Sequence, residues 1–400
     1  MDNRKILFVW SANYPWDVRL EKEIKFLQKN NFECSLLTRN TKLSSVEECL
    51  NGLHIYRVGR FIKNTKIDKL LSFPFYINPF WFFSILKTIT RVHPDLIIIR
   101  DIPLALSVQF IAKLFHINTI IDMAEPYPCA IKVFDKYMNN FITRFLFKTL
   151  DWYQYIENKA CQNANHIFVV VQDNIERIQT HSKICSDKIS IVSNTPELET
   201  LFFKDNFQEI SKLKVVYTGN VDGTFRGIMI LVEAAKLLKN QSVEFNIIGD
   251  GNYIAKIQEE IKLNNLKNIN LIGKLSHNEL LKALEEQHIG IIPHDNSDYI
   301  KYTIPNKIFD YMAHSLPVIV SSAKPLKRIV EETDCGYVYE ACNSKSLAEC
   351  IEYVLNNKQE LILKAQNGYN AVKNKYNWEN DSKVMLKKFN EILEHNNVFC

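Results

Sequence analysis

Tyr302-Thr-Ile-Pro-Asn-Lys-Ile-Phe-Asp-Tyr-Met-Ala-His-Ser-Leu-Pro-Val-Ile-Val-Ser321 predicts a short helix followed by a buried strand. Pro305 and turn-forming residues precede the predicted helix, residues 306–313, and a second proline follows its end. The apolar run Val318–Val320 then reads as the strand. This stretch therefore predicts one helix–strand step of an α/β fold.

The predicted helix carries a cation and a carboxylate on one face, because Lys307 and Asp310 are three residues apart. Lys307 lies in the first turn, beside backbone N–H groups without partners inside the helix, where a phosphate is stabilised. The cation would contact a diphosphate, and the carboxylate would accept hydrogen bonds from ribose hydroxyls. The alternative is a surface ion pair, which residues at this spacing commonly form.

Short apolar runs alternate with helical segments along the chain. In the first half they are Ile6–Trp10, Cys34–Leu37, Leu96–Ile99, Thr119–Ile121 and Ile167–Val171. In the second half they are Leu213–Thr218, Val243–Ile248, Ile269–Ile272, Ile289–Ile292 and Val318–Val320. This pattern is typical of doubly wound α/β domains, whose ligands bind at the carboxyl ends of parallel strands.

The length of 400 residues predicts more than one domain. The boundary falls near Pro196, where polar residues follow an apolar run. We therefore expect Rossmann-like domains at residues 1–195 and 196–375, and a final helical segment at residues 376–400. Two such domains facing each other would leave a cleft, the usual place for a two-substrate site.

Composition excludes several other classes of protein. With 46% hydrophobic residues, 24% charged residues and a formal charge of +4, the chain is ordinary for a folded protein. No run of lysine and arginine is long enough to indicate a nucleic-acid partner. The nine cysteines are scattered without a Cys-x-x-Cys pair, which indicates a reduced, cytoplasmic compartment and no zinc site.

Two segments bear on membrane contact. The N-terminus has only a short apolar run, which predicts a first strand and not a signal peptide. Residues 70–86 are strongly apolar, but prolines and polar residues interrupt them, so we do not expect a spanning helix. Their aromatic residues and flanking lysines fit two alternatives. One is peripheral contact with the inner face of the cell membrane, and the other is a buried helical hairpin.

The turn after the predicted strand Leu213–Thr218 is rich in glycine. Gly219 and Gly223 would let the backbone approach a ligand closely, and Arg226 could bind phosphate oxygens bidentately. The spacing fits neither a Walker P-loop nor a dinucleotide fingerprint, so a tight turn with a solvated arginine is the alternative. Arg226 and Lys307 both belong to loop–helix junctions of one predicted sheet. We expect them to converge on one diphosphate and to stabilise its developing charge.

With these motifs in place, the chain resembles the GT-B glycosyltransferases, in particular the retaining family 4, or group 1, enzymes of bacterial surface-polysaccharide assembly. The resemblance covers nearly the whole chain. The matching segments, in family order, are Asp17-Val-Arg19, His93-Pro-Asp95 through Asp101, Asp122-Met-Ala-Glu125, Gly219–Gly227, Ile248-Gly-Asp-Gly251, Ile272-Gly-Lys-Leu275, Pro305–Ala313 and Trp378. The resemblance implies an acceptor-binding first domain, a donor-binding second domain and, from Trp378, a last helix that crosses back onto the first domain.

The chain departs from the family pattern at charged positions. The family's Glu-x7-Glu pair falls at Tyr302 and Asp310, as in sub-branches that carry Pro-x-Lys before the second acid. The arginine of its Gly-Arg loop is Asn220, while Arg226 stands at the position of its lysine. The histidine of its Asp-x-His-Glu run is Ala124.

The resemblance implies transfer of a sugar, with retention, from a nucleoside diphosphate sugar to a glycan or lipid-linked glycan acceptor. It implies no metal or other cofactor. Glu125 and Asp101 are the nearest polar candidates to contact the acceptor, with Glu125 as a base an alternative to proton transfer onto the leaving phosphate. Arg226 and Lys307 would stabilise the leaving group. The implied donor contacts are Gly219, Asn220, Arg226, Gly249, Lys274, Leu275, Asn306, Lys307 and Asp310.

Two other functions stay open at this point. A nucleotide-sugar epimerase of GT-B shape would use the same fold. A non-catalytic partner subunit of a glycosyltransferase complex would fit the missing glutamate at Tyr302 and the missing histidine at Ala124.

Overall fold

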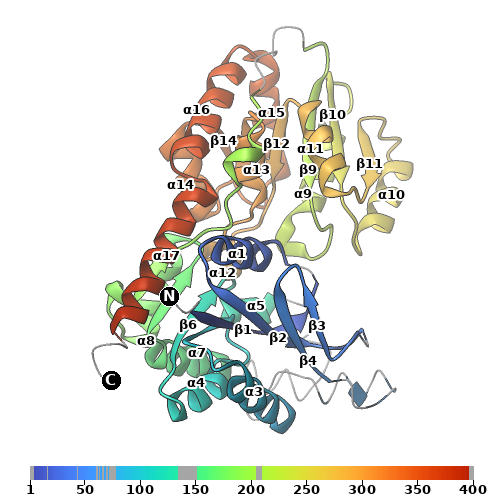
Figure 1. Cartoon of the computed structure of the whole chain (residues 1–400). Coiled ribbons are helices and arrows are strands. Elements are labelled where there is room, and N and C mark those ends of the chain that lie inside the picture. The colour runs from blue at the N-terminus through green and yellow to red at the C-terminus, as the bar shows by residue number, and fades with distance from the viewer. Residues whose placement is uncertain are drawn as a thin grey trace. The chain divides into compact units, whose positions relative to one another are not determined.

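The computed structural model of the chain describes residues 4–15, 17–42, 44–59, 62, 64, 67–68, 71, 78–133, 151–203 and 210–395. The described residues divide into two compact units (Figure 1). Unit 1 contains the described residues up to 132, residues 151–192 and those from 382 onward, and unit 2 contains Val133, residues 193–203 and residues 210–381.

Unit 1 is built on a sheet whose described strands have the order β3-β4-β2-β1-β5-β6-β7-β8. Their bounds are β1 (Lys5–Asn13), β2 (Glu33–Arg39), β3 (Glu47–Leu50), β4 (Leu53–Val58), β5 (Leu96–Arg100), β6 (Asn118–Met123), β7 (His166–Val169) and β8 (Ile189–Ile191). Neighbouring strands pair in parallel, except for the antiparallel hairpin of β3 and β4. The central strands β5 and β7 are buried along their whole length and mostly apolar, since both faces of a parallel sheet are covered by other elements.

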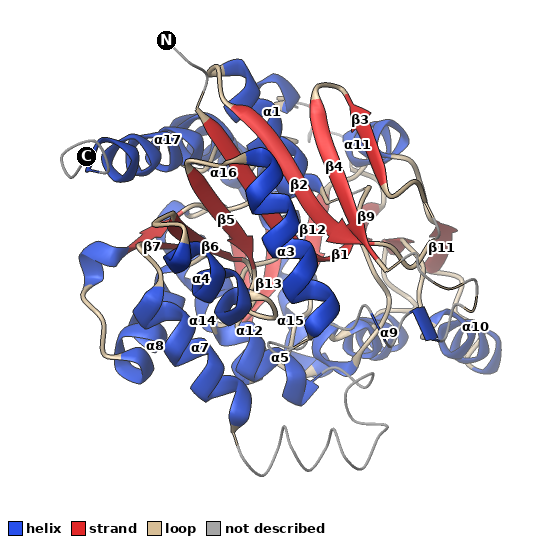
Figure 2. Ribbon diagram, turned by 60° about the horizontal axis from the view of Figure 1, so that its bottom comes forward, coloured by secondary structure: helices blue, strands red, loops and turns tan. Residues whose placement is uncertain are grey.

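Helices of unit 1 bury one apolar stripe each. They are α1 (Val18–Lys29), α3 (Pro79–Val92), α4 (Ala105–Leu114), α5 (Tyr127–Val133), α7 (Trp152–Asn163) and α8 (Gln172–Ser182), with a 3₁₀ turn η2 (Ser186–Lys188). The inner faces of α3, α4 and α7 share one core with β1, β5, β6 and β7, so these helices cover one face of the sheet (Figure 2). The helix α17 (Trp378–His395) belongs to unit 1 from Ser382 on, where Phe389 packs against Phe168.

Unit 2 has a second parallel sheet, with the order β11-β10-β9-β12-β13-β14 among its described residues. The strands are β9 (Leu213–Thr218), β10 (Val243–Ile248), β11 (Ile269–Gly273), β12 (Ile289–Ile292), β13 (Val318–Ser321) and β14 (Gly336–Tyr339). The helices are η3 (Leu198–Thr200), η4 (Thr224–Arg226), α9 (Ile228–Leu237), α10 (Ile254–Leu263), α11 (His277–Glu285), α12 (Asp298–Lys301), α13 (Lys307–Ala313), α14 (Lys324–Thr333), α15 (Ser344–Asn356) and α16 (Glu360–Asn374).

The predicted fold class of two doubly wound α/β domains is confirmed. The hairpin of β3 and β4 was not predicted, because β3 is exposed along its length and has no apolar run. The predicted strand Ile167–Val171 ends at Val169. The spacing of apolar residues also predicts a helix over residues 141–163, of which residues 141–150 lie outside the described residues and the rest contains α7.

Each sheet has a switch point, where the strand order reverses and neighbouring loops turn to opposite faces. In unit 1 it lies between β1 and β5, and in unit 2 between β9 and β12. Ligands of doubly wound domains bind in the crevice at the carboxyl ends of the strands at such a point. The loops after these four strands are therefore the first places to look for a site.

Candidate functional site

The turns after β9 and β10 contact each other through the backbone atoms of Gly219 and Gly249. Gly249 has a φ of 150°, and a Cβ added to it would lie 1.8 Å from the carbonyl oxygen of Gly219. Gly219 has a φ of 114°, and its N–H donates to Ile248 O at 2.8 Å. Only glycine fits such a contact at a positive φ. The two turns therefore form one rigid rim at the carboxyl ends of the strands.

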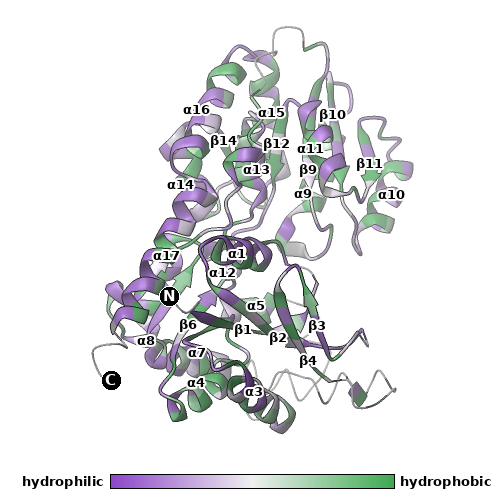
Figure 3. Ribbon diagram, in the orientation of Figure 1, coloured by the Kyte–Doolittle hydropathy of each residue, from purple (hydrophilic) through white to green (hydrophobic). Residues whose placement is uncertain are grey.

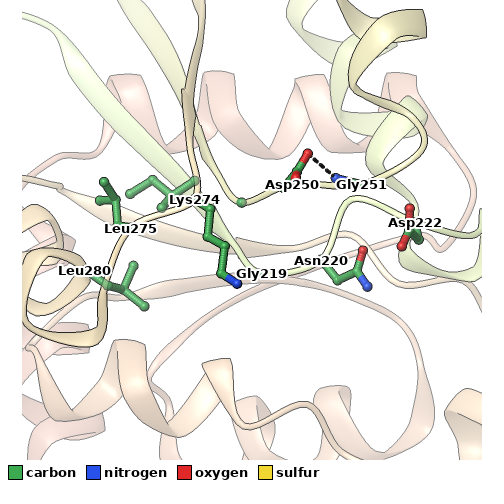
Figure 4. Close-up of a pocket in the computed structure, with 10 residues that line it drawn as sticks. Gly219, Asn220, Asp222, Asp250, Gly251, Lys274, Leu275 and Leu280 are labelled. Atoms are coloured by element: carbon green, nitrogen blue, oxygen red, sulfur yellow. Dashed lines mark hydrogen bonds between the residues drawn. The ribbon is translucent and has the colours of Figure 1, made fainter. Parts of the chain in front are cut away.

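A pocket of about 450 Å³ opens at this rim (Figure 4). It is lined by Gly219, Asn220, Asp222, Ile248, Gly249, Asp250, Gly251, Lys274, Leu275 and Leu280. In Figure 4, Lys274, Leu275 and Leu280 lie on one side of the pocket, and Asn220 and Asp222 lie on the other. Its size falls within the range of small-molecule sites, and its mixture of apolar and polar walls suits a nucleoside.

Lys307, the first residue of α13, is a buried cation next to this rim. Its side chain is 8% exposed, and its Nζ has no hydrogen-bond partner. Nζ lies 4.0 Å from the centroid of the Tyr217 ring and 3.4 Å from where a Cβ on Gly219 would be. The pKa of Lys307 is lowered to about 7, first by burial and then by the charge of Arg226, against the opposing effect of Asp310. An ammonium in this setting is stabilised by an anion.

Arg226 provides the second cation, from the 3₁₀ turn η4 that links β9 to α9. Its guanidinium lies 5.1 Å from the centroid of the Phe225 ring, and its Nε has no hydrogen-bond partner. The next residue, Gly227, has a φ of 66°. It lies so close to the loop after β12 that a Cβ added to Gly227 would be 1.5 Å from Pro293 O. This turn holds Arg226 at the switch point, near enough to Lys307 to repel its charge.

The structure brings most of the sequence-predicted donor residues of unit 2 together. Gly219, Asn220, Gly249, Lys274 and Leu275 line the pocket.

The remaining donor residues lie on or beside the cation side of the rim. Lys307 and Arg226 meet at Gly219 and Tyr217. Asp310 is one turn further along α13, and Asn306 precedes that helix and is exposed. Because Lys307 is buried and its ammonium has no hydrogen-bond partner, the alternative of a surface ion pair with Asp310 does not describe it.

Glu125, the predicted acceptor-side residue, lies in unit 1 after β6. Asp101 follows the neighbouring strand β5 in a left-handed conformation with a φ of 62°, which is unusual for a residue with a side chain. Its carboxylate accepts a hydrogen bond from Ala124 N at 3.2 Å. The pKa of Asp101 is raised to about 7, first by burial and also by the charge of Glu125, against the opposing charge of Arg100. The two carboxyl groups therefore lie close together within unit 1.

The Asp17-Val-Arg19 segment supports the same end of the unit 1 sheet. Asp17 accepts a hydrogen bond from Leu20 N at 2.9 Å and so begins α1. Arg19 and Arg100 both donate to the buried carboxylate of Asp122, at 3.0 and 2.6 Å. Both arginines hold the pKa of Asp122 below its usual value against the effect of burial. These groups fix the carboxyl ends of β5 and β6.

Sequence reasoning did not single out several wall residues of the pocket. Asp222 accepts a hydrogen bond from Asn252 N, and Asp250 accepts one from Gly251 N at 2.8 Å. The signal for Asp250 was available in the Gly-Asp-Gly turn after an apolar run. Leu280 had no such signal, because it lies on α11 and only the fold brings that helix to the pocket.

The match to a known protein family lies within unit 2. Residues 212–357, within unit 2, match the family model described as Glycosyl transferases group 1. An uncharacterised glycosyltransferase of Methanocaldococcus jannaschii is 28% identical over 169 residues, 42% of this chain and 46% of that protein. AmsK, an amylovoran biosynthesis glycosyltransferase of Erwinia amylovora, is 24% identical over 173 residues, 42% of each chain. The chain matches less than half of the length of these relatives.

Solved structures resemble the chain over almost its whole length. Sucrose-phosphate synthase of Thermosynechococcus elongatus has a TM-score of 0.80 at 14% identity, covering 98% of this chain and 100% of that one. HepE of Anabaena, solved with UDP and glucose, has a TM-score of 0.69 at 12% identity, covering 97% and 100%. The resemblance to group 1 glycosyltransferases of GT-B fold is confirmed. The chain thus has the GT-B fold and carries a glycosyl transferases group 1 domain in its second unit.

Proposed function

We propose that this protein transfers a sugar from a nucleoside diphosphate sugar to an acceptor hydroxyl. The observation that carries the proposal is the buried ammonium of Lys307. It has no hydrogen-bond partner, it lies beside Gly219, and it is repelled by Arg226. Two cations held close together at a switch point, next to a nucleoside-sized pocket, fit a diphosphate.

The geometry suggests how the donor would lie. The nucleoside would occupy the pocket, with its base near Gly249, Lys274 and Leu275, and Asp310 would accept hydrogen bonds from the ribose. The diphosphate would lie against Gly219, between Arg226 and Lys307. HepE of Anabaena was solved with UDP, which supports a uridine nucleotide as the first donor to test.

In the reaction, the bond between the anomeric carbon and the phosphate oxygen breaks, and its electron pair stays on the diphosphate. Lys307 and Arg226 would stabilise that charge as it develops. The acceptor oxygen bonds to the anomeric carbon on the same face, so the configuration is retained. Its proton passes to the departing phosphate oxygen, with no metal or other cofactor required. On the acceptor side, Asp101 and Glu125 of unit 1 would bind the acceptor. AmsK is named for amylovoran biosynthesis, which supports a glycan or lipid-linked glycan acceptor in polysaccharide assembly.

Thermal unfolding with a panel of nucleotides tests donor binding. We expect UDP or another nucleoside diphosphate to raise Tm, because a ligand that binds only the folded state stabilises it by about 2.7 kcal/mol at 100 times its Kd. For a unit of this size the shift is roughly 5–10 °C. Uridine, which lacks the phosphates, is the matched control and should shift Tm much less. Equal shifts with uridine and UDP would contradict a diphosphate site.

Turnover separates the three candidate functions. A transferase releases UDP from UDP-sugar in proportion to added acceptor, and an epimerase converts the donor without acceptor. A non-catalytic subunit binds the donor and releases nothing.

Of residues 70–86, for which membrane contact or a buried hairpin was predicted, residues 70 and 72–77 lie outside the described residues. The part that lies in α3 has both buried and exposed side chains. Trp81 is fully buried in the unit 1 core, whereas Phe83 is 67% exposed. Phe110 on the neighbouring α4 is 59% exposed, and Tyr155 on α7 is likewise 59% exposed. One turn after these residues come exposed lysines, namely Lys87, Lys113 and Lys159. Each of the three helices therefore carries one of these exposed aromatic side chains, and Figure 3 shows the ribbons of α3 and α4 coloured by hydropathy.

We propose that the face of α3, α4 and α7 carrying these side chains rests on an anionic membrane surface. Aromatic rings suit the headgroup zone, and the lysines attract anionic lipids. Neither α3 nor α4 contains an acidic residue to oppose that attraction. Among the described residues, no helix is long and apolar enough to cross a bilayer.

Vesicle sedimentation tests this face with a double variant, Phe83→Ser with Phe110→Ser. We expect about tenfold or more weaker binding to phosphatidylglycerol-containing vesicles, because each ring removes apolar area from the contact. Tm should be unchanged, since both rings are exposed. Leu263→Ser in unit 2, where the side chain is 77% exposed, is the matched control. Equal binding of the double variant, or no binding of the wild type, would exclude the proposed face.

A further inference from the structure

His294 is a buried imidazole without a partner. It is 3% exposed, and neither Nδ1 nor Nε2 has a hydrogen-bond partner. Buried polar atoms in native proteins are nearly always hydrogen-bonded, so a ring with two unsatisfied nitrogens needs an explanation. A ligand that binds to this ring would provide one.

The fold holds His294 against the turn that carries Arg226. His294 is the second residue after β12, on the strand that neighbours β9 at the switch point. Asp295 N donates to Phe225 O at 2.9 Å, and the rings of Phe225 and Tyr299 meet edge to face at 5.4 Å. Pro293 O lies against Gly227 on the other side of the histidine. The loop is therefore fixed to the turn on both sides of His294.

The charged groups facing His294 are cations. Burial lowers its pKa well below the usual value, and the charges of Lys307 on α13 and Arg226 on η4 lower it further. Asp310 on α13 acts on Lys307, and Tyr217 on β9 lies under the Lys307 ammonium. Without an anion, the imidazole is neutral because a third positive charge would be repelled.

We propose that His294 is a third ligand of the donor diphosphate, and that it takes up a proton from solvent when the diphosphate binds and donates it in a hydrogen bond to a phosphate oxygen. This inference rests on the proposed donor site. An anion between Arg226 and Lys307 reverses the electrostatic setting that keeps the ring neutral. The resulting imidazolium would be a charge-assisted donor of the kind that phosphates bind best.

The proton balance gives a direct test. The pKa of His294 is higher in the bound state than in the free state, so binding takes up a proton and becomes weaker as pH rises between the two values. Near pH 6, Lys307 is already mostly protonated, because its pKa is about 7. Proton uptake at pH 6 that disappears in a His294 variant therefore reports on the histidine.

Calorimetric titration with UDP at pH 6, in buffers of different ionisation enthalpy, measures this uptake. We expect the wild type to take up close to one more proton than His294→Asn, and to bind UDP about tenfold or more tightly. His54→Asn, at an exposed position in unit 1, is the matched control and should behave as the wild type. NMR of the ring nitrogens in the wild type is a second readout, independent of how the variant folds. The His294 signals should move to imidazolium values on addition of UDP.

The outcomes separate the two proposals. If UDP binds to none of these proteins at millimolar concentration, the donor site itself is wrong. If UDP binds to the wild type and to His294→Asn with the same affinity and proton number, the donor site holds and the role of His294 is wrong. An imidazole that stays neutral in the UDP complex would overturn the inference in the same way.

Discussion

Replacing Lys307 with methionine is expected to lower kcat at saturating donor by about 100- to 1,000-fold. The side chain keeps its length and apolar stem, so the change removes a charge and leaves little cavity. Negative charge on the diphosphate grows as the sugar leaves, and Lys307 stabilises the transition state more than the bound donor. The loss therefore falls on kcat and not on donor binding alone.

The same substitution should not destabilise the unliganded protein. The pKa of Lys307 is about 7 in the folded state against an ordinary 10.5, so the unfolded chain binds more protons between these values. The free energy of unfolding of the wild type should therefore rise from pH 7 to pH 10, by an amount on the order of a few kcal/mol from this group. The methionine variant should lack this rise. Denaturant melts at pH 7 and pH 9 measure the difference.

Lys327→Met, on the exposed side of α14, is the matched control for loss of one positive charge in unit 2. It should keep its turnover. Near-normal kcat in Lys307→Met would remove Lys307 from the reaction, and a large fall in its stability at pH 7 would show that the buried ammonium has a partner in the folded protein.

Replacing Gly249 with alanine should abolish nucleotide binding and lower Tm by several degrees. The new methyl group would lie 1.8 Å from Gly219 O, so the rim must move apart. Strain at the positive φ adds to this overlap, and together they should cost roughly 2–4 kcal/mol. Because Gly219 adjoins Lys307 and the pocket, the movement displaces both halves of the donor site at once.

Gly273→Ala isolates the effect of backbone strain. Gly273 ends the neighbouring strand β11 at a φ of 83°, and a Cβ there would meet nothing within 4 Å. We expect a cost of about 1 kcal/mol and intact UDP binding. Thermal unfolding and UDP titration of both variants give the comparison. Equal loss of binding in the two would mean that the close contact of the turns is unimportant.

The sequence predicted most of the strands because buried parallel strands leave unbroken apolar runs, as in Leu96–Ile99, whereas the exposed strand β3 leaves none. It also pointed to Gly219, Arg226 and Lys307, which stand next to such runs or to a helix start, and the structure places these three residues beside one another. The sequence could not show that Lys307 is buried and that its ammonium has no hydrogen-bond partner, because this environment includes the ring of Tyr217 on strand β9. Nor could the sequence show that Trp81 is buried while Phe83 is exposed, because a run of aromatic residues does not reveal which side of the helix faces the core.

The low pKa of Lys307 also changes its chemistry toward electrophiles. A lysine whose pKa is lowered to about 7 is uncharged near neutral pH far more often than an ordinary lysine, and an uncharged amine is a nucleophile. A diphosphate beside it would restore the proton and remove the lone pair from reaction. We therefore expect a small acylating reagent that reaches Lys307 to modify it more slowly when UDP is bound.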